Sequence, residues 1–119
     1  MKVLMINGSP HAQGNTALAL REMEKIFAEC GIEVETVHVG NRAIRGCIAC
    51  GSCGKTGKCV FDDLVNQVAA KLATYDGIVV GSPVYYASPN GTLLSFLDRL
   101  FYSTGHIEKR MKVGASVVC

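Results

Sequence analysis

The chain has 119 residues, of which 49% are hydrophobic, and its net charge is +2. This length suits one domain, and the composition favours a buried core over intrinsic disorder. The small charge gives no reason to expect nucleic acid or an anionic membrane surface as a partner, and no apolar stretch approaches the roughly 20 residues of a membrane-spanning helix. We therefore expect a soluble, cytoplasmic protein.

The first part of the chain predicts a strand, a helix and a second strand. Residues 2–7 form a short apolar run typical of a buried strand, which stops at Gly8. Residues 15–30 carry apolar side chains at helical spacing, and Gly31 stands where that helix should end. Residues 33–39 alternate between apolar and polar types, as in a half-buried or edge strand.

The second part continues this alternation after a cysteine-rich loop at roughly residues 40–60. Asp62 and Asp63 are expected to cap a second helix, whose apolar side chains run to Leu72. The remaining elements are a strand at 77–82, a loop at 83–89, a helix that starts at Asn90 or Thr92, and a strand at 112–119. This order predicts an α/β fold, a doubly wound parallel sheet with helices on both faces, in a single domain over residues 1–119.

The loop after the first strand has the character of a phosphate site. It reads GSPHAQGNT over residues 8–16 and leads into a helix. Such a loop directs backbone N–H groups and the helix dipole at one point, and Ser9, Asn15 and Thr16 add short polar side chains. The pattern is neither a dinucleotide fingerprint nor a Walker loop, so a phosphate monoester, with FMN as the leading candidate, is favoured. The alternative is that these three side chains only cap the helix.

The loop after the third strand reads SPVYYASP over residues 82–89. It should lie beside the phosphate loop, because the carboxyl ends of parallel strands share one edge of the sheet. Pro83, Tyr85 and Tyr86 could flank a flat heteroaromatic ring. The alternative is that the two tyrosines fill the core or a subunit contact.

Four cysteines in the loop at 40–60 follow the spacing C-x2-C-x2-C-x5-C: Cys47, Cys50, Cys53 and Cys59. The first three have the spacing of ferredoxin ligands to a [4Fe–4S] cluster, so a redox centre is the first hypothesis. Empty thiols, zinc and disulfides are alternatives, although structural zinc usually takes two separated ligand pairs and disulfides suit secreted chains, whereas no signal-peptide pattern is present. Cys30 and Cys119 are interpreted as small buried apolar residues.

Together these motifs resemble a known family. GSP-x4-GNT after the first strand, SPVYY after the third, and Leu97-Asp98-Arg99 in the last helix are similar to the NADPH-dependent FMN reductase family of flavodoxin-like proteins. The cysteine loop resembles that of the iron–sulfur flavoproteins of anaerobic archaea and bacteria, which carry FMN and a [4Fe–4S] cluster. The resemblance covers essentially the whole chain.

The resemblance implies a role for each matching residue. Ser9, Asn15 and Thr16 would hold the FMN phosphate, with His11 at a position where relatives often have Arg. The residues that would line the isoalloxazine are Pro83, Val84, Tyr85 and Tyr86. The ligands of the cluster would be Cys47, Cys50, Cys53 and Cys59.

The number of predicted strands departs from this fold. A flavodoxin-like sheet has five strands in the order 2-1-3-4-5, and this chain offers four. We therefore expect a domain that is truncated after its fourth strand and incomplete at its C-terminus, without the family loop that completes the flavin pocket. Such a domain should depend on self-association into a homo-oligomer for its stability.

The expected function is an FMN-dependent oxidoreductase in which a cluster couples a one-electron carrier such as ferredoxin to the flavin. No side chain is expected to be catalytic in itself, and Asp98 and Arg99 are interpreted as a structural pair at a helix end. The cysteine loop is expected at the carboxyl edge of the sheet, on the same side as the flavin. One alternative is a cluster-free NAD(P)H-dependent FMN or quinone reductase. Another is a fragment that is not an enzyme and lacks a usable flavin site.

Overall fold

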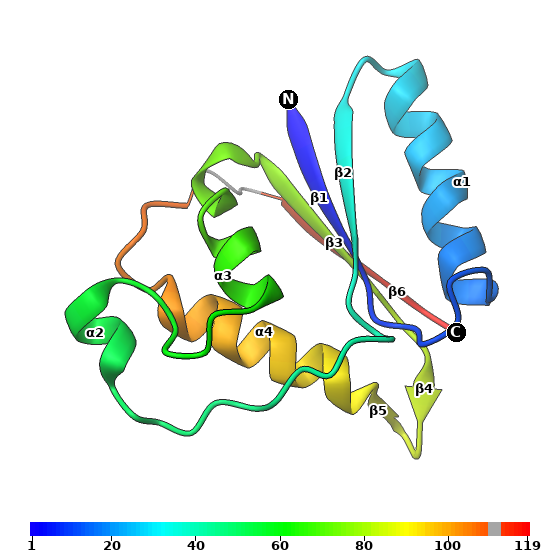
Figure 1. Cartoon of the computed structure of the whole chain (residues 1–119). Coiled ribbons are helices and arrows are strands. Elements are labelled where there is room, and N and C mark those ends of the chain that lie inside the picture. Colours follow the sequence, from blue (N-terminus) through cyan, green and yellow to red (C-terminus); the bar gives the residue numbers. More distant parts are fainter. Residues whose placement is uncertain (110–112) are drawn as a thin grey trace.

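The computed structural model describes residues 1–109 and 113–119. Its main sheet has four parallel strands in the order β2-β1-β3-β6 (Figure 1). The strands are β1 (Lys2–Asn7), β2 (Glu33–His38), β3 (Gly77–Ser82) and β6 (Val113–Val118). The predicted parallel α/β sheet is confirmed, and only the start of the last predicted strand, residue 112, lies outside the described residues.

Helices cover both faces of this sheet. Helix α1 (Asn15–Glu29) lies on one face, and α3 (Leu64–Ala69) and α4 (Gly91–Ser103) lie on the other (Figure 1). Helix α1 ends as predicted, with Gly31 in the left-handed region at a φ of 71°. Helix α3 is shorter than its apolar pattern suggests, because the last turn of that pattern forms a separate 3-10 helix, η1 (Leu72–Thr74).

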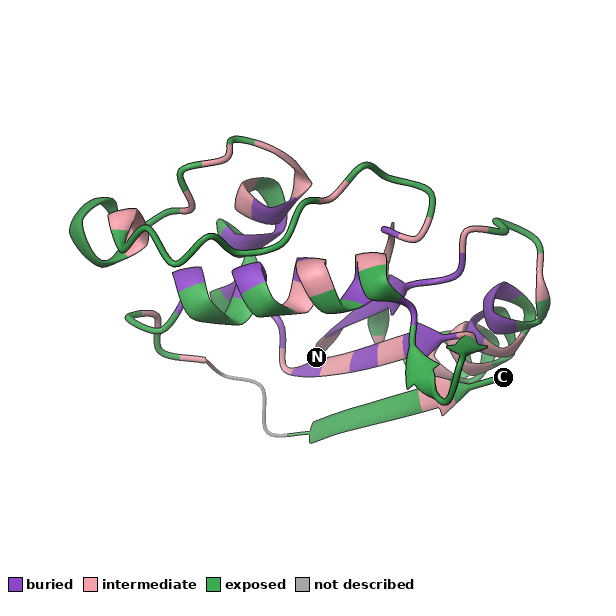
Figure 2. Ribbon diagram, turned by 90° about the horizontal axis from the view of Figure 1, so that it is seen from below, coloured by how far each residue is buried: buried purple, intermediate pink, exposed green. Residues whose placement is uncertain are grey.

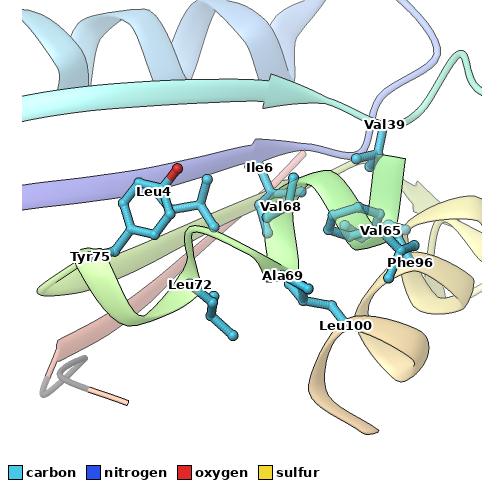
Figure 3. Close-up of a cluster of buried hydrophobic side chains, with 11 residues drawn as sticks. Leu4, Ile6, Val39, Val65, Val68, Ala69, Leu72, Tyr75, Phe96 and Leu100 are labelled. Atoms are coloured by element: carbon cyan, nitrogen blue, oxygen red, sulfur yellow. The ribbon is translucent and has the colours of Figure 1, made fainter. Parts of the chain in front are cut away.

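The two faces differ in how much they bury. Eleven buried side chains form the core between the sheet and helices α3 and α4 (Figure 3). They are Leu4, Ile6, Val39, Val65, Val68, Ala69, Leu72, Tyr75, Leu93, Phe96 and Leu100. Among the described residues, the buried cluster under α1 is smaller and consists of Val3, Met5, Leu20 and Val79. Strand β6 is almost wholly exposed (Figure 2), and Cys30 and Cys119 are exposed too, so their predicted burial is wrong.

Two predicted loops contain short regular elements. The cysteine loop includes α2 (Ser52–Thr56), and the segment after β3 folds into a hairpin of β4 (Val84–Tyr85) and β5 (Ser88–Pro89). The two residues at the hairpin tip, Tyr86 and Ala87, have φ values of 48° and 60°. Positive φ at both central positions is typical of the tight turns that join hairpin strands, although Gly and Asn usually occupy them. Across the described residues, no helix combines the length and apolarity needed to cross a membrane.

Candidate functional site

The predicted phosphate loop lies at the carboxyl edge of the sheet, against the end of β3. The backbone N–H of Gly8 donates to the carbonyl of Gly81 at 2.8 Å, and β1 and β3 are paired through Asn7 and Gly81. The loops that follow these two strands therefore start side by side, as predicted. This edge is where ligands bind in doubly wound folds.

The polar residues of this loop have different environments. Ser9 and Thr16 are buried, whereas His11 and Asn15 are exposed. The hydroxyl of Ser9 accepts a hydrogen bond from the backbone N–H of His11 at 3.2 Å. No side chain caps α1, whose N-cap residue is Gly14. The alternative in which Ser9, Asn15 and Thr16 only cap the helix is therefore wrong, and the N–H groups of the first turn remain available to an anion.

Two residues that sequence reasoning missed hold this loop in place. The Nε2 atom of His38, at the end of β2, lies 2.6 Å from the carbonyl oxygen of Ser9. A Cβ added at Gly40 would lie 2.2 Å from both the carbonyl carbon and oxygen of Ser9, so only glycine fits there. The only sequence signal was their position, directly after a strand that pairs with β1.

The hairpin after β3 presents its predicted ligand-binding residues to solvent. Val84 is 48% exposed, Tyr85 is 47% exposed and Tyr86 is fully exposed, while Pro83 is half-buried. The alternative in which the tyrosines fill the core is therefore wrong. The hairpin turn is strained, because two residues other than glycine have positive φ values. Strained backbone of this kind is concentrated at binding sites.

The four cysteines of the loop line one small cavity of about 20 Å³, together with Phe61, Arg99 and Tyr102. Cys47 and Cys50 are exposed, and Cys53 and Cys59 are half-buried. All four are free thiols, so the disulfide alternative is wrong. Within residues 1–109 and 113–119, no group of three or more His, Cys, Asp or Glu is gathered tightly enough to hold a metal ion.

The local backbone bends the chain around this cavity. Gly51 and Gly57, which flank α2, have φ values of 71° and 76°, and Ala49 has a φ of 53°. The N–H of Ala49 donates to the sulfur of Cys47 at 3.4 Å. Four thiols that open on one concavity, with backbone and cationic N–H donors beside them, fit an anionic cluster in the number and chemistry of the ligands.

Cys59 is the cysteine that the surrounding structure holds most firmly. Its N–H donates to Oδ1 of Asn66 at 3.0 Å, and Nδ2 of Asn66 donates back to its carbonyl at 2.9 Å. Its sulfur accepts a hydrogen bond from Nε of Arg99 at 3.3 Å. Asn66 and Arg99 come from α3 and α4, so both helices of the buried face position this cysteine. Sequence reasoning missed both contacts.

Arg99 forms an ion pair with Asp63, and the predicted pairing of Asp98 with Arg99 is wrong. The two carboxylate oxygens of Asp63 accept from Nη1 and Nη2 of Arg99, at 2.7 and 2.9 Å. Asp63 also caps α3, as predicted, by accepting from Val65 N–H at 3.0 Å. Burial by itself lowers the pKa of Arg99, but the hydrogen bonds with Asp63 and Cys59 outweigh it, so the pKa lies above its ordinary value.

The cysteines do not lie beside the phosphate loop. The loop that carries them leaves the carboxyl edge and runs along α4, so that α2 packs near the C-terminal end of that helix (Figure 1). The hairpin β4–β5 leads into the N-terminal end of α4 at Asn90, which caps the helix. A helix of 13 residues is about 20 Å long, so the two predicted sites are separated within one chain by roughly this length. The expectation that they share one edge is corrected.

Comparisons with known proteins identify the family of this chain. The sequence profile of the NADPH-dependent FMN reductase family matches residues 1–119. An iron–sulfur flavoprotein of Methanocaldococcus jannaschii is 38% identical over 117 residues, which cover 98% of this chain and 61% of the relative. An iron–sulfur flavoprotein of Archaeoglobus fulgidus is 32% identical over 118 residues, which cover 99% of this chain and 54% of the relative. The chain thus spans between half and two thirds of the length of these relatives.

A solved structure supports the fold. The NAD(P)H:quinone oxidoreductase of Methanothermobacter marburgensis superposes with a TM-score of 0.74 at 15% identity, covering 99% of this chain and 64% of that one. At this identity the likeness concerns the fold, which is flavodoxin-like. Fold, motif positions and profile agree, and the chain belongs to the NADPH-dependent FMN reductase family.

Proposed function

We propose that this chain forms the cofactor-binding part of an iron–sulfur flavoprotein that passes electrons between a one-electron carrier and an acceptor. Bound FMN would supply one- and two-electron transfer and a [4Fe–4S] cluster would supply one-electron transfer. The observation that carries this proposal is the pair of arrangements at the two ends of α4. One is the uncapped N-terminus of α1 beside an exposed aromatic hairpin, and the other is four thiols lining one cavity.

The proposed flavin site uses backbone and neutral side chains of this chain. The first-turn N–H groups of α1, together with Ser9, Asn15 and Thr16, would bind the phosphate, and the dipole of α1 favours its charge. His11 is exposed beside them and adds a positive charge only when protonated. The hairpin residues Pro83, Val84, Tyr85 and Tyr86 would contact the ring, with the tyrosines excluding water from one of its faces.

The proposed cluster site uses Cys47, Cys50, Cys53 and Cys59 as thiolate ligands. A cavity of about 20 Å³ is too small for a cluster, so the exposed part of the loop must rearrange when the ligands close around one. Lys55 and Lys58 are exposed in the same loop and give it a positive surface beside the thiols. This surface suits docking of an acidic one-electron carrier of the ferredoxin class.

The separation of the two sites supports assembly into a homo-oligomer. Electron transfer over the length of α4 would be slow, whereas a second copy can bring its own flavin site to the exposed cysteine loop. Tyr86, Tyr102 and Ile48 are exposed apolar side chains near the two sites and suit such contacts. Six free cysteines favour a reducing compartment, the cytoplasm of a cell that lives with little oxygen.

The test is to purify the protein without oxygen and to assay iron, sulfide, zinc and FMN on the sample whose absorption spectrum is recorded. We expect flavin bands over a broad sulfur-to-iron absorption, with about four irons per chain. A colourless protein would contradict the proposal. FMN without iron would instead favour a cluster-free NAD(P)H-dependent FMN or quinone reductase. The loose arrangement of the four thiols also supports this alternative.

A further inference from the structure

Arg99 uses its full hydrogen-bonding capacity inside the molecule. Its side chain has no exposed surface, and a guanidinium carries five N–H donors. Two donors bind the carboxylate of Asp63, and two bind the backbone carbonyls of Arg45 and Phe61, at 3.3 and 3.1 Å. The fifth donor, on Nε, points to the sulfur of Cys59 at 3.3 Å. Every donor therefore has an acceptor.

A structural role alone does not explain this choice of acceptors. The ion pair with Asp63, whose side chain is 30% exposed, accounts for two of the donors of Arg99 and leaves the donor on the sulfur unexplained. The carboxylate and the two carbonyls tie α4 to the start of α3 and to the cysteine loop with four donors. The sulfur is the acceptor that lies at the cavity lined by all four thiols.

Cys59 is held through its backbone as well as through its sulfur. The reciprocal hydrogen bonds of Asn66 fix the backbone of Cys59, and the guanidinium of Arg99 fixes its side chain. Cys47 and Cys50 are exposed, and the hydrogen bond to the sulfur of Cys47 comes from its own loop. Cys59 is thus the ligand whose position the rest of the fold determines.

We propose that Arg99 is a positioning residue that fixes the Cys59 ligand and raises the reduction potential of the cluster held there; this inference rests on the proposed function. One-electron reduction of a cluster bound there would add one negative charge next to Cys59. A cationic N–H donor on a ligand sulfur would stabilise the more negative state, and burial of the Arg99 side chain reduces the screening of its charge by water. The reduced state is therefore favoured.

The first test uses the unaltered, iron-loaded protein. Arginine is labelled with 15N, the cluster is reduced, and pulsed electron paramagnetic resonance records nitrogen nuclei that couple to the unpaired electron. We expect a 15N coupling in the arginine-labelled protein and none in protein labelled at lysine. Absence of an arginine coupling would overturn the inference, and this test needs no variant to fold.

The second test compares reduction potentials of Arg99→Lys and the control Arg45→Gln. Lysine keeps the charge but cannot reach Cys59, Asp63 and Phe61 together. The equilibrium constant for reduction of the cluster should therefore fall about tenfold, which lowers the reduction potential by about 59 mV. Arg45→Gln removes a nearby cation that stacks on the ring of Phe61 at 4.5 Å, and should shift the potential far less.

The outcomes separate the two proposals. Equal reduction potentials in the wild type and an iron-loaded Arg99→Lys variant would overturn only the proposed role of Arg99. An equal shift in Arg99→Lys and Arg45→Gln would do the same. A wild-type protein that takes up no iron would overturn the proposed function, and the role of Arg99 would fall with it.

Discussion

The phosphate loop and the cysteine loop show two ways of preparing a binding site. At the phosphate loop, Gly8, Gly40 and Gly81 bring three backbone segments into direct contact, so the loop has its shape before any ligand arrives. The cysteine loop is held firmly at Cys59, while Cys47 and Cys50 are exposed. Close backbone contacts thus constrain the phosphate loop along its length, whereas the cysteine loop is constrained mainly at its last cysteine.

The largest effect is expected at the phosphate loop. Gly40→Ala places a methyl group 2.2 Å from the backbone of Ser9, and backbone cannot move aside as a flexible side chain can. We expect a loss of about 3 kcal/mol in the free energy of unfolding, measured by urea titration, together with weaker FMN binding. Gly54→Ala is the matched control, because its new methyl group meets nothing within 4 Å. Equal stability of the two variants would show that the phosphate loop is not preformed.

A smaller effect is expected at the anchor of the cysteine loop. Asn66→Ala removes both hydrogen bonds to the backbone of Cys59. The free energy of unfolding should fall by about 2 kcal/mol, because the N–H and the carbonyl of Cys59 lose their partners. We also expect less iron per chain after reconstitution, with FMN content unchanged. Gln67→Ala, at an exposed position of the same helix, is the control. If iron uptake is the same in both variants, Cys59 is not the anchor of the site.

Relief of strain is expected at the hairpin tip. Ala87 has a φ of 60°, which costs a residue with a Cβ about 1 kcal/mol relative to glycine. Ala87→Gly should therefore raise the free energy of unfolding by about this amount. Ala19→Gly, inside α1, should lower it instead, because glycine weakens a helix interior. A stabilised Ala87→Gly variant that binds FMN less tightly would show that the strained turn shapes the flavin site. A lower free energy of unfolding in Ala87→Gly would show that Ala87 is not strained.

The smallest effect is expected on β2, outside both loops. Lys71 donates to Glu35 at 2.7 Å, and this contact, followed by the hydroxyl of Tyr75 and then by Lys2, lowers the pKa of Glu35 from 4.5 to about 2. The stabilisation is present above pH 4.5 and is lost as the pH falls towards 2. Because Lys71 is mostly exposed, Glu35→Gln should cost about 1 kcal/mol or less at pH 7. When thermal unfolding is measured from pH 7 to pH 2, the melting temperatures of the wild type and Glu35→Gln should converge. A difference that stays constant would contradict a stabilising role of ionised Glu35.

Local patterns in the sequence were sufficient for most of the fold. The apolar run at 2–7 and the caps at Asp63 and Asn90 act through neighbouring residues, and each is found where it was predicted. The contacts that shape the candidate sites join distant residues. Arg99 and Asp63 are 36 positions apart, and an arginine in an apolar helix gives no sign of which carboxylate it will meet.

The position of the cysteines could not be predicted for a different reason. A connection of about twenty residues with little regular structure can take many paths, so the strand before it does not determine where its far end lies. The loop here follows α4 because Arg99 binds the carbonyls of Arg45 and Phe61, which stand on either side of the four cysteines. These contacts involve backbone atoms, which carry no signature in the sequence.

The hydrogen bond between Arg99 and Cys59 also bears on the order of events during synthesis. The two residues are 40 positions apart, so all four cysteines leave the ribosome well before the helix that anchors the last of them. Chains begin to fold from their N-terminal part while synthesis continues. The nascent chain therefore exposes four unanchored thiols for a time, and Cys59 becomes oriented only after α4 has been synthesised.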